Sequence, residues 1–449
     1  MTQSTFEPRQ PLYRMFMGAP GRVYLLLCAM LFIEYIDRVN LSAAAPLIKA
    51  ELGLSNTQLG LALSAFGYCY AAFQIVNGYL GDRFGPRLTL TLCGILWATG
   101  TLLTGFASGL TALVLARLLV GLGEAGTIPT GTRVMTNWVP KVRRGFAQGF
   151  THSSARLAAG ITPPLVVAMI PVFGWRGAFI ALGAVSLAWV AAWAFYFRND
   201  PKDHPGVTSH ELAALPVYGS HGSTVPIPYK RLIVRTLPVA FVFFCHAWTL
   251  WLYLSWLPTF FTETYRVDLK ASALFTSGVF LAGMVGDTVG GLLTDAIYKR
   301  TGDLNRSRRD AVIVGFAGSL LFLLPVLFVH HQLTVILALA AAFFFLEITE
   351  APVWAVPIDI APQFAGLAGG IMSTAAGLAA TLSPFVFGII TDVTGSYRVP
   401  FILSIALMGA GIAASFLMRP DRAVLVEATV MEPTGPLPAL EPKLANLKP

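Results

Sequence analysis

The chain has 449 residues, of which 55% are hydrophobic and only 12% are charged, and its mean hydropathy is +0.67. Soluble domains contain about 25% charged residues, so this composition excludes a soluble fold and indicates a polytopic membrane protein. Bases beside membrane segments account for the net charge of +8, so we predict no nucleic-acid partner.

A membrane-spanning helix needs about 20 apolar residues. The chain offers twelve such stretches, at 23–45, 59–81, 88–107, 111–138, 146–171, 178–198, 236–261, 270–297, 311–330, 332–361, 367–393 and 399–418. The first stretch is too long for a cleavable signal peptide, and it contains Glu34, Asp37 and Arg38. We therefore predict an all-α membrane protein with twelve transmembrane helices.

A polar segment divides these helices into two sets of six. The predicted organisation is an N-terminus at 1–22, a six-helix bundle at 23–198, a linker at 199–235, a second bundle at 236–418 and a tail at 419–449. The halves also share a pattern, because Gly78-x-x-x-Asp82 recurs as Gly291-x-x-x-Asp295. Repeated halves are typical of rocker-switch transporters, whose substrate site lies midway between them.

The Lys and Arg residues predict the orientation. An even number of helices places both termini on one side of the membrane. The loops predicted on that side hold most of the bases, including Arg83, Arg87, Arg143, Arg144, Lys299 and Arg300. The opposite loops hold Lys49, Arg176, Arg266, Lys270 and Arg398. The positive-inside rule then predicts cytoplasmic termini in a plasma membrane, the inner membrane of a bacterium.

Four ionisable residues lie at bilayer depth: Asp37 and Arg38 in the first stretch, and Arg117 and Glu124 in the fourth. Each costs about 2.5–3.5 kcal/mol on insertion scales, so such residues usually mark an ion or substrate path. An arriving anion can compete for an arginine and allow the released carboxylate to take a proton. This interpretation makes the chain a proton-coupled anion transporter; the alternative is a static ion-pair network that joins helices.

Four motifs resemble a known family. The run from Gly78 to Arg87 reads G-x-L-x-D-R-x-G-x-R and resembles the loop signature of the major facilitator superfamily, with Pro86 in place of a base. Tyr35-Ile-Asp37-Arg38-Val-Asn40-Leu-Ser42 resembles the anion:cation symporter family. So do the runs Ala116-Arg117-x-x-x-Gly121-x-x-Glu124-Ala and Trp256-Leu-Pro258. The resemblance covers about residues 20–418.

The resemblance implies a fold of two six-helix halves and a role for each matching residue. Asp37 and Glu124 would be the protonation sites, Arg38 would contact the substrate, and Arg117 would adjust the proton affinity of Glu124. Further substrate-binding positions would be Tyr35, Tyr70, Arg156, Trp354 and Ser373. A conformational loop motif would consist of Gly78, Asp82, Arg83 and Asp295, whose acids would stabilise one closed state.

Some assignments stay open in the sequence. Arg156 is expected either to bind a second carboxylate or to pair with an acid in the tenth helix. Glu347 and Glu350 are expected either to bind a cation or to pair with Arg156, and we favour the pairing. His152 and His246 are interpreted as hydrogen-bonded interior residues, with proton relays as the alternative. The run Gly121-Leu-Gly-Glu-Ala-Gly126 lies inside a membrane helix, so we interpret its glycines as packing positions, not as a dinucleotide site.

We therefore predict a proton-coupled importer of a small organic anion, most plausibly a sugar acid such as a hexonate, hexuronate or aldarate. The alternatives are uptake of an aromatic or simple mono- or dicarboxylate, a metabolite or drug exporter of the same fold, and a non-transporting sensor. We expect no enzymatic activity, no cofactor and no metal. The expected partners are the anion, protons and the lipid bilayer, and we expect a monomer.

Overall fold

The computed structural model describes residues 16–140, 144–215, 228–361 and 365–424. Their helices are α1 (Gly18–Leu52), α2 (Asn56–Phe84), α3 (Pro86–Gly105), α4 (Leu110–Glu124), α5 (Thr127–Trp138), α6 (Arg144–Tyr196), η3 (Pro201–Asp203), α7 (Ser209–Ala214), α8 (Tyr229–Tyr265), α9 (Leu269–Thr301), α10 (Leu304–Phe328), α11 (Gln332–Glu347), α12 (Glu350–Ile360), α13 (Ala365–Thr394) and α14 (Pro400–Ser415). No strand occurs among these described residues.

The prediction of twelve transmembrane segments is confirmed. Ten apolar helical segments of the described chain are long enough to cross a membrane, with α4 and α5 forming one and α11 and α12 another. The segment within α6 contains two crossings, because Gly174 interrupts it with φ 65° and ψ 172°. The shorter apolar helix α14 completes the set.

Two expected boundaries differ in detail. The fifth and sixth predicted stretches follow each other without a loop, because a single glycine in the left-handed region turns the chain. The second bundle begins at Tyr229, seven residues before the predicted start at 236. The predicted linker also contains η3 and the short helix α7, while residues 216–227 and 425–449 lie outside the described part.

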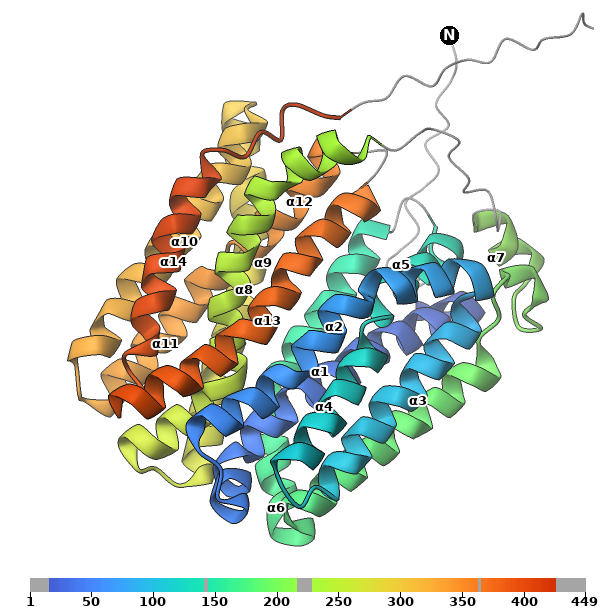
Figure 1. The fold of residues 1–449 in the computed structure, drawn as a ribbon. Coiled ribbons are helices and arrows are strands. Elements are labelled where there is room, and N and C mark those ends of the chain that lie inside the picture. The colour runs from blue at the N-terminus through green and yellow to red at the C-terminus, as the bar shows by residue number, and fades with distance from the viewer. Residues whose placement is uncertain (1–15, 141–143, 216–227, 362–364, 425–449) are drawn as a thin grey trace, which may run out of the picture.

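The chain forms two bundles that lie beside each other, α1–α6 and α8–α14 (Figure 1). The halves meet where α2 packs on α13, α1 on α8 and α6 on α9. Glycines allow the closest of these approaches. A Cβ built on Gly60 would lie 2.5 Å from the carbonyl oxygen of Pro384, and one built on Gly67 would lie 2.7 Å from the backbone nitrogen of Thr381.

Polar contacts also join the halves at the face opposite the start of α1. Asp392 on α13 accepts hydrogen bonds from the backbone nitrogens of Asn56 (3.1 Å) and Thr57 (2.7 Å), at the beginning of α2. Lys49 on α1 pairs with Glu263 on α8 at 3.0 Å. We call these five residues the far-face latch. In this state the two halves are held together at that face.

The linker packs against the opposite end of the first bundle. The His204 ring contacts the rings of Trp138 and Tyr196, with centroids 5.6 and 4.7 Å away. Its Nδ1 accepts a hydrogen bond from the Gly206 nitrogen at 3.0 Å. Burial lowers the pKa of His204, so this ring favours the neutral form that the contact requires.

Candidate functional site

The predicted acids and arginines of α1 and α4 meet inside the first bundle. Arg38 Nε donates a hydrogen bond to Glu124 Oε2 at 2.6 Å, and Arg117 Nη1 donates to the backbone oxygen of Asp37 at 2.9 Å. Asp37 Oδ2 accepts from Ser186 on α6 at 2.9 Å. The direct partner of Glu124 is therefore Arg38, whereas Arg117 holds the backbone of α1.

This cluster includes an acid, Glu34, to which the sequence analysis assigned no role. Glu34 is fully buried, and its Oε2 lies 3.8 Å from Arg38 Nη2. Neither Glu34 oxygen has a hydrogen-bond partner among the described residues. Its spacing of i, i+4 from Arg38 was visible in the sequence and places both on one side of α1. We name Glu34, Asp37, Arg38, Arg117 and Glu124 the N-half cluster.

The N-half cluster contains more negative than positive groups. Its three carboxyl groups are 0% exposed, and its two arginines are 6% and 2% exposed. Three ionised carboxylates against two guanidinium groups would leave a buried net negative charge, which is costly out of water. Electrical neutrality is reached when one of the three carboxyl groups holds a proton.

Aromatic rings surround the Arg38 guanidinium. Its carbon lies 4.7 Å from the ring centroid of Tyr35, 5.3 Å from that of Phe66 and 5.0 Å from that of Tyr70. Rings at these distances attract a cation through their quadrupole. Nη2 donates no hydrogen bond to any described residue. The rings therefore hold the Arg38 guanidinium in place, and its Nη2 can still donate a hydrogen bond to an anion.

The sequence around Glu124 explains why this residue lies in the N-half cluster. Helix α4 ends at Glu124 and α5 begins at Thr127, whose hydroxyl donates to the Glu124 carbonyl oxygen at 2.6 Å. Gly121 lies so close to the Phe66 carbonyl oxygen on α2 that a built Cβ would collide with it. The glycine-rich run therefore packs α4 onto α2, as predicted.

A second charged group lies between the halves. Arg156 on α6 pairs through Nη2 with Glu347 Oε2 on α11 at 3.0 Å and with Glu350 Oε1 on α12 at 3.3 Å. The favoured expectation, that these acids pair with Arg156, is confirmed. Arg156 and Glu347 are buried, with exposed fractions of 9% and 0%.

Trp354 and His246 complete this second group. Trp354 Nε1 donates to Glu350 Oε1 at 3.1 Å, and the Trp354 ring packs edge-on against Phe243. His246 on α8 lies with Nε2 3.0 Å from Glu350 Oε2. We name Arg156, His246, Glu347 and Glu350 the interface cluster. The sequence favoured an interior role for His246 and left a proton relay as the alternative.

The other predicted positions lie apart from these contacts. Ser373 is partly exposed on α13. Gly78 on α2 faces Pro129 on α5, while Arg83 donates to the Tyr79 hydroxyl at 3.1 Å, and Asp295 is exposed on α9. The side chain of Asp82 lies outside the described residues. Nothing in these positions tests the predicted role of the loop motif.

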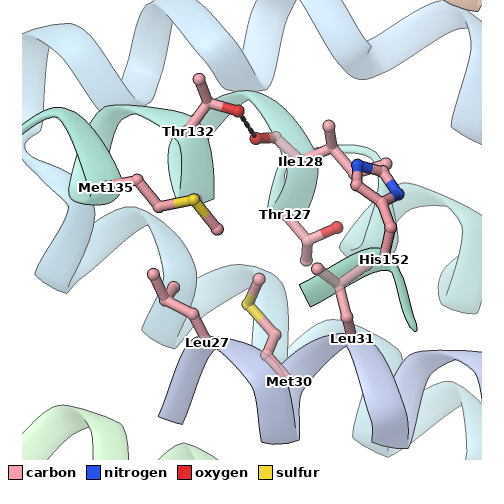
Figure 2. Close-up of a pocket in the computed structure, with 9 residues that line it drawn as sticks. Leu27, Met30, Leu31, Thr127, Ile128, Thr132, Met135 and His152 are labelled. Atoms are coloured by element: carbon pink, nitrogen blue, oxygen red, sulfur yellow. Dashed lines mark hydrogen bonds between the residues drawn. The ribbon is translucent and has the colours of Figure 1, made fainter. Parts of the chain in front are cut away.

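An apolar pocket lies between α1, α5 and α6 (Figure 2). Met30 and Met135 point into it, and His152 lies at its edge. Its volume of about 10 Å³ is close to what one water molecule requires. It is too small for an organic anion, so the substrate interpretation rests on the charged residues.

Curated relatives cover most of this chain. A protein named "Probable sulfoacetate transporter SauU" from Cupriavidus necator is 48% identical over 88% of this chain and 93% of its own length. The "Probable L-galactonate transporter" of Escherichia coli is 32% identical over 88% of each chain. The "Hexuronate transporter" of Bacillus subtilis is 30% identical over 89% of this chain and 94% of its own.

A solved structure has a similar fold. It is a bacterial homolog of the human lysosomal transporter Spinster in an inward-facing, unoccupied conformation, with a TM-score of 0.73. That chain is 16% identical, and the match covers 89% of the present chain and 97% of the other.

The twelve-helix fold and these relatives define an integral membrane transporter of the organic-anion and sugar-acid class, not an enzyme. The profile of the major facilitator superfamily matches residues 27–365, and the chain belongs to that superfamily.

Proposed function

We propose that this protein is a symporter that couples uptake of a small organic anion to protons. The observation that carries the proposal is the excess of buried carboxyl groups in the N-half cluster. A proton held there neutralises the cluster when it is empty, and an anion that engages Arg38 changes how many protons the cluster favours.

The proposed exchange is centred on Arg38. An arriving carboxylate or sulfonate competes with Glu124 for the guanidinium, because both are anionic acceptors for the same donors. A carboxylate that loses its guanidinium partner in a buried site favours the protonated form. Glu124 or Asp37 therefore takes up a proton as the anion binds, and both travel together.

The proposed substrate is a compact dianion, with a sugar acid as the alternative. Arg156 is a second buried arginine, and Tyr35, whose ring lies against the Arg38 guanidinium, also interacts electrostatically with Arg156. Tyr24 donates to the Ala147 oxygen and so aligns α1 with α6. Tyr24 and Ala147 are therefore taken to lie at the same depth in the membrane. From that level, the rise along α1 to Arg38 exceeds the rise along α6 to Arg156 by about 8 Å. Sulfoacetate carries one sulfonate and one carboxylate, one for each arginine.

The proposed transport cycle is rocker-switch alternating access. Opening the far face requires the latch between Asp392 and α2 to separate, along with the Lys49–Glu263 pair. We place this face outside the cell and both termini in the cytoplasm, on the distribution of Lys and Arg. The protein is proposed to act as a monomer.

Uptake of labelled sulfoacetate into proteoliposomes tests the proposal. An inside-alkaline pH gradient should drive accumulation in the natural protein, and Glu124→Gln should abolish accumulation while retaining exchange of external for internal anion. Glu51→Gln is the matched control, because it removes an exposed carboxylate that pairs with Arg176 inside the first bundle and should leave the pH dependence unchanged. Accumulation that ignores the pH gradient would refute proton coupling.

A further inference from the structure

The interface cluster contains more acceptors than its donors satisfy. Arg156 is shared by Glu347 and Glu350, so two carboxylates face one guanidinium. Glu347 is completely buried, and its Oε1 has no hydrogen-bond partner among the described residues. A buried carboxylate oxygen without a partner is unfavourable unless it binds a proton or a cation.

His246 connects this excess to a titratable ring. Its Nδ1 lies 2.8 Å from the Thr349 hydroxyl, and its Nε2 lies 3.0 Å from Glu350 Oε2. The Thr349 hydroxyl also lies 2.8 Å from the Leu346 carbonyl oxygen, to which it donates. With that proton engaged, Nδ1 donates to Thr349. His246 Nε2 and Glu350 Oε2 lie close together but form no hydrogen bond among the described residues, so a proton on the ring would pair with the carboxylate by charge.

Further charged or titratable groups from three helices lie near these side chains. Besides Arg156, α6 contributes His152, α9 contributes Asp287 and α1 contributes Tyr35. Asp287 adds a third carboxylate near the same guanidinium. The surroundings therefore increase the negative excess around Arg156 and favour uptake of positive charge.

A proton suits this excess better than a metal ion. One ligand atom each from His246, Glu347 and Glu350 lies within 4.8 Å of the others, which is close enough for a metal site. Arg156, however, lies 3.0 and 3.3 Å from the two carboxylates and would repel a divalent cation. A proton needs no such space and can move between the imidazole and the carboxylates.

We propose that His246, Glu347 and Glu350 form a second proton-binding site, so that two protons accompany each dianion. The proposal rests on the proposed symport. When the second acidic group of the substrate engages Arg156, the two carboxylates lose their shared counter-ion, and one takes a proton from the outer solution. That proton leaves on the cytoplasmic side once the anion departs and Arg156 pairs with them again.

The ratio of protons to anions tests this site. Proteoliposomes containing a trapped pH dye would be supplied with labelled sulfoacetate, and both fluxes would be measured together. The natural protein should move two protons per sulfoacetate, whereas Glu350→Gln and His246→Asn should each move one. His331→Gln, which alters an exposed histidine at the start of α11, should retain the ratio of two.

The outcomes separate the two proposals. If the natural protein moves sulfoacetate without any protons, or does not move it, the proposed symport fails and this inference fails with it. A ratio of one in the natural protein, or a ratio of two that persists in both variants, overturns the second site alone. Exchange of labelled for unlabelled sulfoacetate confirms that each variant is folded. If neither variant folds, the ratio of protons to sulfoacetate in the natural protein tests the second site, because a ratio of one overturns it.

Discussion

The two charged clusters differ in how they relate to the halves of the molecule. All five residues of the N-half cluster belong to the first bundle, whereas Arg156 of the interface cluster belongs to the first bundle and its partners to the second. Movement of one half against the other changes the contacts of Arg156 and leaves the Arg38–Glu124 pair within one unit. Movement of the halves alone therefore leaves the contacts of the first cluster intact, while it changes the contacts of the second.

The clusters also share a feature. Helix α4 is interrupted directly after Glu124, and α11 is interrupted directly after Glu347. In both halves a buried glutamate thus occupies the end of a helix within the membrane, opposite an arginine from another helix. The comparison predicts that the two arginines contribute unequally to binding.

Loss of Arg38 should have the largest effect. Arg38→Ala removes the proposed anion contact and leaves Glu124 buried without its partner, a type of change that typically destabilises by about 3–5 kcal/mol. We expect no measurable binding of sulfoacetate and a clearly lower melting temperature. Calorimetric titration and thermal unfolding would measure the two effects. Arg38→Lys should recover much of the stability, and an Arg38→Ala protein that binds normally would contradict the proposed contact.

Loss of Arg156 should have a smaller and more selective effect. Arg156→Gln should weaken binding of sulfoacetate by about 10- to 150-fold, because one charge-assisted contact contributes roughly 1.5–3 kcal/mol. Binding of a monoanion such as galactonate should change little. Competition between the two anions against a labelled substrate would measure the selectivity. If Arg156→Gln weakened the binding of both anions equally, Arg156 would not bind the second acidic group of sulfoacetate.

A wider side chain between the halves should alter their equilibrium. Gly67→Val would place atoms against Thr381, where a built Cβ already lies only 2.7 Å from the hydroxyl and the backbone nitrogen. We expect the far face to open in most molecules and uptake to fall about 10-fold. Gly278→Ala is the control, because no neighbour lies within 4 Å of its built Cβ. Labelling of a cysteine introduced near the latch would report the opening.

Weakening the latch should have the smallest effect. Asp392→Asn removes a negative charge from the beginning of α2, where it accepts from two backbone nitrogens. Such helix-end interactions contribute about 0.5–2 kcal/mol, so the open population should rise by a few-fold. The same cysteine labelling would measure this change, and an unchanged labelling rate would show that Asp392 does not hold the halves.

Several features could be predicted from the sequence because apolar length and intramembrane charge are local signals. The twelve spans and the pairing of Arg156 with the helix-ten acids are examples. The break between 171 and 178 was also predicted, but the sequence did not show that Gly174 alone would turn the chain without a loop. The choice of Arg38 over Arg117 as the direct partner of Glu124 depends on how α1 and α4 rotate against each other, and spacing within one helix does not specify that rotation.

The most direct test of the account is proton uptake when the purified protein binds its anion. Sulfoacetate added to the protein in weakly buffered solution should raise the pH, because Glu124 or Asp37 takes a proton as Arg38 engages the anion. The combined variant Asp37→Asn, Glu124→Gln should bind without that proton uptake at the N-half cluster and so give a smaller rise. Binding of sulfoacetate with no change in pH in the natural protein would contradict the account.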